Sequence, residues 1–241
     1  DQEFAINLFQ QCVEIYIPKL SLHNKEKVLE EANDTGETQL ILEFDDFRKI
    51  GTEFIDQIWS ILGHTHLTSK LMELSLNNNN DIYQLEVCSM LLQQLCEGTN
   101  FQQSPMLSDA LEQEDSKIIN QNIKMLEVGL THPVLKNDFI KTATRFLATV
   151  ASYFNISDNK KPVLNHCIDV LFKTLSDSAK NTQETEFMIC KTLTTLCETC
   201  RFQLNSYLDS FMDILQTMLQ PSDPSNAATN VTSNGIKISA L

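Results

Sequence analysis

The chain has 241 residues, of which 42% are hydrophobic and 21% are charged, a composition that allows a continuous core and argues against wholesale disorder. It contains only six Gly and six Pro, fewer turn-forming residues than architectures built from strands and turns usually need. Its formal net charge of −14 repels phosphate groups and therefore disfavours direct binding of nucleic acid or of a membrane.

Apolar residues recur with a 3.6-residue spacing along most of the chain, which predicts an all-α protein. Pro18 is expected to end or kink the first helix. About nine helices are expected, at about 3–17, 43–62, 67–76, 82–97, 116–130, 137–155, 162–179, 184–201 and 205–220. Polar loops are expected at 19–42, 99–115 and 221–234, the first with room for one extra turn around 27–32.

The spacing of the helix pairs indicates a repeat architecture. From Ser116 onward, successive pairs begin about 40–45 residues apart, which is typical of two-helix HEAT repeats. One pair cannot bury its apolar stripe alone, so residues 1–241 are expected to stack as a single HEAT-repeat α-solenoid, an α-α superhelix of antiparallel pairs. Neither end shows a polar capping repeat, so we expect a segment of a longer protein.

No feature of the sequence predicts a membrane or secretory protein. No apolar run reaches the roughly 18 residues of a spanning helix, and Asp1-Gln2-Glu3 has the wrong charge for a signal peptide. All seven Cys lie within helical apolar patterns, which indicates reduced thiols in a cytosolic or nuclear protein.

Motifs that would carry chemistry are missing from the sequence. Cys197 and Cys200 form a CxxC pair, but no second pair or nearby His completes a zinc site, so both are expected to be core thiols. His166 and Cys167 are adjacent on a helix, where side chains diverge by about 100° and cannot form a nucleophile pair. The sequence contains no glycine-rich phosphate loop, GxSxG or HExxH. We therefore expect no enzyme activity, no metal and no cofactor.

Charge is distributed unevenly along the chain. Residues 1–115 carry 21 acidic and 6 basic side chains, a net charge of −15, whereas residues 116–241 carry 11 and 12, a net charge of +1. An acidic field of this kind attracts basic partners. The alternative is that the acidic residues only keep the chain soluble.

Four stretches of the sequence carry local motifs within the predicted helices and at their ends. They are Asp46-Phe47-Arg48 with Asp56 and Leu62-Gly63; Asp81-Ile82-Tyr83-Gln84-Leu85-Glu86; Thr142-Ala143-Thr144 with Tyr153-Phe154; and Thr192-Leu193, Cys197, Cys200, Leu204 and Tyr207-Leu208. These stretches resemble the importin-β superfamily of nuclear transport receptors, and most of all its transportin-SR and importin-thirteen branch. The branch has corresponding helices with a Phe-Arg pair, with an aromatic residue and a Glu, with a Thr and a Tyr, and with two Cys.

The sequence departs from this pattern after the third stretch. Asn155 lies where the branch has a Trp, and the next turn is Asn159-Lys160-Lys161-Pro162 rather than His-Pro. The acidic bias and the Asn-rich loops are compatible with a divergent fungal member of the branch.

The resemblance implies a function in nuclear transport. Members of the superfamily bind protein cargo on the concave side of the solenoid and Phe-Gly nucleoporin repeats on the convex side. They bind Ran in its GTP form mainly through N-terminal repeats, which this segment would lack. The resemblance therefore implies a segment from the middle of a receptor that shuttles between cytoplasm and nucleus with protein cargo, which the acidic charge predicts to be basic.

The resemblance also places the helices at 3–17, 67–76, 116–130, 162–179 and 205–220 on the concave side. The candidate cargo contacts are the acidic residues expected to be exposed there, namely Glu14, Glu73, Glu127, Asp169, Asp177, Asp209 and Asp213. The alternative for these residues is that each is simply solvated. The alternative for the whole chain is a HEAT scaffold or a regulatory subunit of another multiprotein complex, because fold alone does not decide function.

Overall fold

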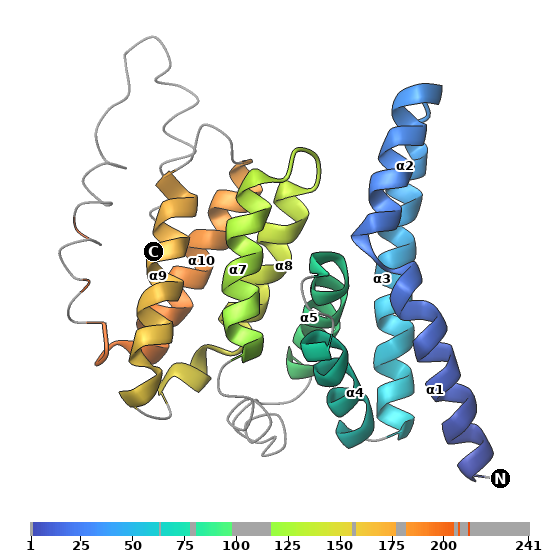
Figure 1. Cartoon of the computed structure of the whole chain (residues 1–241), viewed down its shortest axis with the longest axis horizontal. Helices are drawn as coiled ribbons and strands as arrows, with labels where there is room; N and C mark the ends of the chain where they lie inside the picture. The colour runs from blue at the N-terminus through green and yellow to red at the C-terminus, as the bar shows by residue number, and fades with distance from the viewer. Residues whose placement is uncertain are drawn as a thin grey trace. The chain divides into compact units, whose positions relative to one another are not determined.

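The computed structural model describes residues 2–62, 64–77, 81–97, 117–155, 158–176 and 182–204, together with Tyr207 and Met212. No strand occurs within these ranges, so the predicted all-α class is confirmed. The elements are α1 (Gln2–Lys19), α2 (Leu22–Thr35), α3 (Gln39–Leu62), α4 (His64–Asn77), α5 (Ile82–Glu97), α7 (Lys117–Thr131), α8 (Lys136–Thr149), η2 (Ala151–Asn155), η3 (Asp158–Lys160), α9 (Lys161–Ser176) and α10 (Gln183–Cys200) (Figure 1).

Residues 1–146 form one compact unit. In it, α3, α5 and α8 make one row of helices, linked by side-chain contacts from α3 to α5 and from α5 to α8. The helices α1, α4 and α7 make a second row, and α2 packs on α3 and α5. Apolar side chains from both rows are fully buried between them, among them Ile55, Leu71, Leu91, Leu126 and Phe139.

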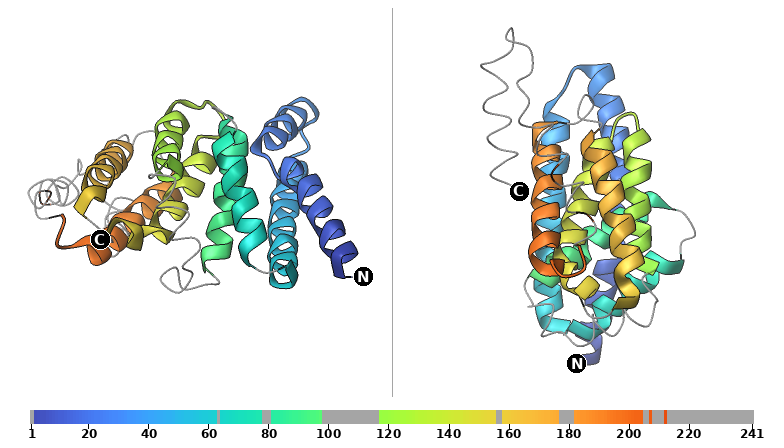
Figure 2. Two further views of the ribbon diagram at one scale, coloured as in Figure 1. Left: turned by 60° about the horizontal axis from the view of Figure 1, so that its bottom comes forward. Right: turned by 90° about the vertical axis from the view of Figure 1, so that its left-hand side faces the viewer.

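Residues 147–241 form the second unit, of which α9 and α10 are the main described elements. These two helices lie side by side and antiparallel, and η2 packs against both (Figures 1 and 2). The core of the unit includes Tyr153, Phe154, Leu171, Leu193 and Leu196, all with no exposed surface.

The prediction of a loop over 19–42 is wrong. The 14-residue helix α2 occupies most of it, and α3 begins at Gln39 rather than at residue 43. The Ser21 hydroxyl caps α2 by accepting from the backbone N–H of His23 at 3.2 Å. At the other end Gly36 adopts φ 78°, and its N–H donates to the carbonyl of Ala32 at 2.8 Å. Since only three residues of α2 are buried, the helix leaves little apolar periodicity in the sequence.

The expected helix over 137–155 is also broken. The α-helix α8 ends at Thr149, and the 3-10 helix η2 follows. Val150, Ala151, Tyr153 and Phe154 are all buried, a density of apolar residues that one face of an α-helix cannot hold. The loops predicted at 99–115 and 221–234 lie outside the described residues, as does the helix at 205–220 apart from Tyr207 and Met212.

Candidate protein-interaction surface

The three candidate cargo contacts in the first unit lie on one row of helices. Glu14 on α1, Glu73 on α4 and Glu127 on α7 are all exposed. They share the row with basic residues: Glu73 lies 4.0 Å from the ammonium of Lys70, and Lys70 and Glu14 both line a small groove between α1 and α4. This row therefore carries charge of both signs.

The remaining candidates belong to the second unit. Asp169 is exposed on α9 and interacts with the phenol of Tyr207. Burial first, and then the negative charge and hydrogen bond of Asp169, raise the pKa of Tyr207. Asp177, Asp209 and Asp213 lie outside the described residues.

The acidic charge gathers instead on α2 and α3, here called the acidic hairpin (residues 22–62). It carries ten carboxylates against four basic side chains, and eight of the ten are exposed. Three large apolar side chains of α3 are also more than half exposed: Leu42 at 60%, Ile50 at 64% and Ile61 at 63%. The carboxylates are Glu26, Glu30, Glu31, Asp34, Glu37, Glu43, Asp45, Asp46, Glu53 and Asp56.

A buried ion pair holds the hairpin to the rest of its row. Arg48 on α3 is 9% exposed and Glu86 on α5 is 0% exposed. One guanidinium nitrogen of Arg48 donates to both carboxylate oxygens of Glu86 at 2.8 Å, and the hydroxyl of Thr142 on α8 donates to Glu86 Oε1 at 2.7 Å. A single carboxylate thus fixes the positions of three helices. Charges this deeply buried require partners, because desolvation is expensive.

A second set of ion pairs joins α2 to α3 and α8. The ammonium of Lys25 lies 2.9 Å from Asp45 Oδ1 and 2.8 Å from Asp138 Oδ1. Burial by itself would lower the pKa of Lys25, but hydrogen bonds and the charges of Asp138 and Asp45 outweigh it and raise the pKa above its ordinary value. Lys25 and Arg48 are therefore committed to internal contacts, and the basic side chains that the hairpin leaves exposed are Lys27 and Lys49.

A polar cluster lies where α2 meets α5 and the α7–α8 turn. The hydroxyl of Tyr83 donates to Glu26 Oε2 at 2.8 Å and lies 3.3 Å from His132 Nε2. Burial, followed by the Glu26 contact, raises the pKa of Tyr83 to about 12. His132 Nδ1 accepts the backbone N–H of Leu135 at 3.0 Å. Beside this cluster is a cleft of about 450 Å³, whose lining includes His23, Asp81 and Tyr83.

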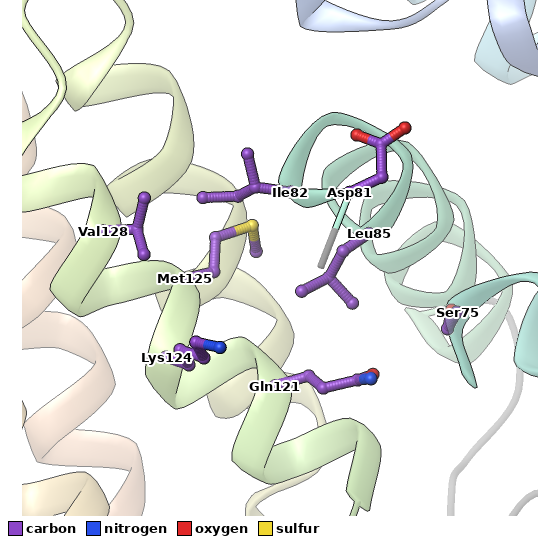
Figure 3. Close-up of a pocket in the computed structure, with 8 residues that line it drawn as sticks. All are labelled: Ser75, Asp81, Ile82, Leu85, Gln121, Lys124, Met125 and Val128. Atoms are coloured by element: carbon purple, nitrogen blue, oxygen red, sulfur yellow. The ribbon is translucent and has the colours of Figure 1, made fainter. Parts of the chain in front are cut away.

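An apolar pocket lies on the other side of the first turn of α5 (Figure 3). Its volume is about 290 Å³. Ile82 and Leu85 of α5 face Met125 and Val128 of α7 across it. The polar residues in its lining are Ser75, Asp81, Gln121 and Lys124.

Three of the four cysteines of the second unit, Cys167, Cys190 and Cys200, are buried in the core, and Cys197 is half-buried. Cys200 is 0% exposed and its Sγ lies 3.5 Å from the carbonyl of Ala151. Burial raises the pKa of Cys200 to about 11, and it does the same for the half-buried Cys197. Thiols with pKa values this high are poor nucleophiles and poor metal ligands at neutral pH. Among the residues that the structure describes, no three His, Cys, Asp or Glu gather as a metal site would require.

Comparison with known proteins identifies the family. The model of the importin beta-like KAP122 middle domain matches residues 1–234. The chain belongs to the importin-β-like family. The fold class is accordingly the HEAT-repeat α-solenoid of these transport receptors, and the predicted resemblance is confirmed at the level of the superfamily. No curated protein matches the chain. Across the described helices, none is long and apolar enough to cross a membrane.

Sequence reasoning found some of these residues and missed others. Arg48, Asp81 and Glu86 stood in the stretches that carried the resemblance, but their pairing was not foreseen. A signal was present, since Arg48 shares the buried stripe of α3 with Ile55 at a spacing of seven residues. A lone Arg and a lone Glu on the buried stripes of two helices indicate a buried pair. Gln121 and Met125 offered no comparable signal, because the pocket exists only where α5 and α7 meet.

Proposed function

We propose that this chain is part of a nuclear transport receptor that binds basic protein cargo and shuttles with it between the cytoplasm and the nucleus. The family match over residues 1–234 supports a transport receptor. The acidic hairpin supports basic cargo, because eight exposed carboxylates on two adjacent helices and the turn between them attract cationic surfaces and speed association with them.

Within the family, we propose the transportin-SR and importin-thirteen branch, on the motif residues that include Arg48, Tyr83 and Glu86. Transit through the pore would use Phe-Gly nucleoporins. Control by Ran-GTP would act mainly through repeats outside this segment. The segment would catalyse nothing and need no cofactor, and its work would be protein binding alone.

Two surfaces are alternative candidates for the cargo-binding site. One is the row of α1, α4 and α7 with Glu14, Glu73 and Glu127, to which Asp169, Asp177, Asp209 and Asp213 of the second unit would be added. The other is the acidic hairpin. We favour the hairpin, because Lys70 and Lys124 dilute the negative charge of the row.

A matched pair of charge reversals decides between the surfaces. One variant of the full-length protein carries Lys at Glu30, Glu31 and Asp34, which are exposed. Glu26 is left unchanged because it holds Tyr83. The other variant carries Lys at Glu14, Glu73 and Glu127. Both variants change the net charge by the same amount, so a difference between them reports the position of the charges.

The readout is the affinity for a basic protein such as a histone at low and high salt. The hairpin variant should bind about tenfold or more weakly at low salt, since each exposed carboxylate contributes up to ~1 kcal/mol. This loss of affinity should shrink at high salt, because the Debye length falls to about 3 Å at 1 M and exposed charges are then screened. A loss of affinity confined to the variant with Lys at Glu14, Glu73 and Glu127 would instead indicate that cargo binds to the row of α1, α4 and α7. Full-length protein that binds neither Ran-GTP nor Phe-Gly peptides would instead indicate a scaffold of another complex.

A further inference from the structure

The apolar pocket between α5 and α7 is the right size for one large side chain. Its volume of about 290 Å³ is at the lower limit of sites for small molecules, which are roughly 300–1,000 Å³. Met125 at its floor is 1% exposed, whereas Val128 at its edge is 36% exposed. The pocket therefore has a dry base and an open edge, as an anchor for a protruding side chain requires.

One polar atom in the pocket lacks a partner. Gln121 Oε1 is buried and has no hydrogen-bond donor among the described residues. The Ser75 hydroxyl, which also lines the pocket, donates instead to the carbonyl of Leu71 at 2.8 Å. A buried acceptor without a donor costs free energy, so a ligand that supplies a donor gains more than its apolar contacts alone. Figure 3 shows the end of Gln121 directed from α7 towards the space beside Leu85.

These two features together specify the chemistry of an occupant. The walls of Ile82, Leu85 and Met125 require an apolar body, and Gln121 Oε1 requires a donor within it. Trp offers an indole N–H and Tyr offers a phenolic O–H, each on a flat apolar ring. Phe and Leu would fill the same space but would leave the acceptor unpaired, and a site built around a hydrogen bond discriminates against such analogues.

The charge at the edge of the pocket indicates which type of residue would stand next to the aromatic one in a bound segment. Asp81 caps α5, its Oδ1 accepting the N–H of Tyr83 at 3.0 Å and of Gln84 at 3.2 Å. Its exposed carboxylate lines both the pocket and the cleft of about 450 Å³ beside Tyr83. A chain that crosses the first turn of α5 would thus place its next side chain against the carboxylate of Asp81, which favours a cation.

We propose that this pocket anchors an extended segment of a partner protein through a Trp or Tyr side chain, with an adjoining Lys or Arg held at Asp81. The inference rests on the proposed function in so far as the partner is basic cargo. It adds a specific element to a charge-based attraction: the acidic hairpin steers basic proteins in general, and the pocket selects those with an aromatic donor beside the basic residue.

Labelled peptides that differ by single groups test the hydrogen bond. Fluorescence polarisation of the full-length protein would compare fluorescein-labelled Gly-Gly-Trp-Lys-Gly-Gly with versions that carry 1-methyltryptophan or Phe in place of Trp, or Glu in place of Lys. The Trp peptide should bind about three- to tenfold more tightly than the 1-methyl peptide, in which a methyl group replaces the donor hydrogen. Equal binding of these two peptides would overturn the role of Gln121.

Four variants locate the binding and separate it from loss of fold. Gln121→Leu should make the Trp and 1-methyltryptophan peptides bind alike, and Met125→Trp should fill the pocket and abolish binding. Asp81→Asn keeps a good helix cap and should remove the preference for Lys over Glu. Gln57→Leu, at an exposed position of α3, is the control and should bind as the unchanged protein does.

The outcomes distinguish this inference from the proposed function. Unchanged peptide binding by Met125→Trp, with helix content and melting temperature preserved, would refute the pocket as the site. Protein that binds Ran-GTP, Phe-Gly peptides and basic protein but none of the labelled peptides would refute the inference and leave the proposed function intact. Protein that binds the Trp-Lys peptide but neither Ran-GTP nor Phe-Gly peptides would refute the proposed function alone.

Discussion

Replacing Glu86 with Ala should be among the most damaging single changes in the first unit. The carboxylate has no exposed surface and accepts two bonds from Arg48 and one from Thr142. Its removal leaves the guanidinium of Arg48, itself 9% exposed, without its counter-ion. Breaking a buried pair in this way costs about 3–5 kcal/mol.

The cost can be measured and assigned by three variants. Urea unfolding followed by circular dichroism should show the loss for Glu86→Ala, and the melting temperature should fall by roughly 6–20 °C for a chain of this size. Glu198→Ala, at an exposed helix position, is the control and should change stability by less than about 0.5 kcal/mol. Thr142→Val removes one bond to a charged group and should cost about 1.5–3 kcal/mol.

The double variant Arg48→Met with Glu86→Leu tests the reasoning itself. Replacing both charges by apolar groups of similar size should restore most of the stability, because the loss in Glu86→Ala comes from an unpaired buried charge. A loss below about 1 kcal/mol for Glu86→Ala would mean that water reaches Arg48. A double variant as unstable as the single one would mean that packing, rather than charge, is what Glu86 provides.

Three further predictions concern other contacts. The pKa of Lys25 is raised in the folded state, so the stability that Lys25 contributes is fully present below its unfolded pKa near 10.5 and is lost as pH rises through the folded pKa. The difference in free energy of unfolding between wild type and Lys25→Met, measured by urea unfolding, should therefore be constant at about pH 7–9 and decrease at higher pH. Gly129→Ala should destabilise by about 1–3 kcal/mol in the same assay despite a better helix propensity, because the added Cβ would lie 3.1 Å from Phe139 Cβ, which cannot move without its backbone. Burial raises the pKa of Cys167 and of Cys200, so mass spectrometry after brief treatment with a thiol reagent at pH 8 should find both unmodified in the native protein and modified in urea.

The helices with wide apolar stripes were predictable from the sequence. The expected helix at 82–97 has the bounds of α5 (Ile82–Glu97), and the one at 184–201 differs from α10 by a single residue at each end. Helix α2 was not predictable in this way. Its few buried positions include Lys25, which is held by the carboxylates of two other helices. Ion pairs of this kind leave no periodic signal in the local sequence.

The candidate binding surfaces were likewise only partly predictable from the sequence. The concentration of acidic residues in residues 1–115 was visible in the sequence, and the structure shows that ten of these 21 residues lie in the acidic hairpin, eight of them exposed. The candidate contacts Glu14, Glu73 and Glu127 are exposed as expected, but exposure alone does not make a binding site, and their role stays a prediction. The apolar pocket was not foreseen, because Leu85 and Met125 lie 40 positions apart in the sequence.

The sequence by itself determined the all-α class, most of the helices, the family and the sign of the charge. These properties depend on apolar spacing, residue counts and short motifs, which are local or additive along the chain. Only the tertiary structure decided that Arg48 meets Glu86, that Lys25 holds α2 in place, and that α5 and α7 leave a pocket with an unpaired acceptor. Each of these depends on the distance and angle between helices that are far apart in the sequence, and helix packing sets those distances through the shapes of all the side chains between them.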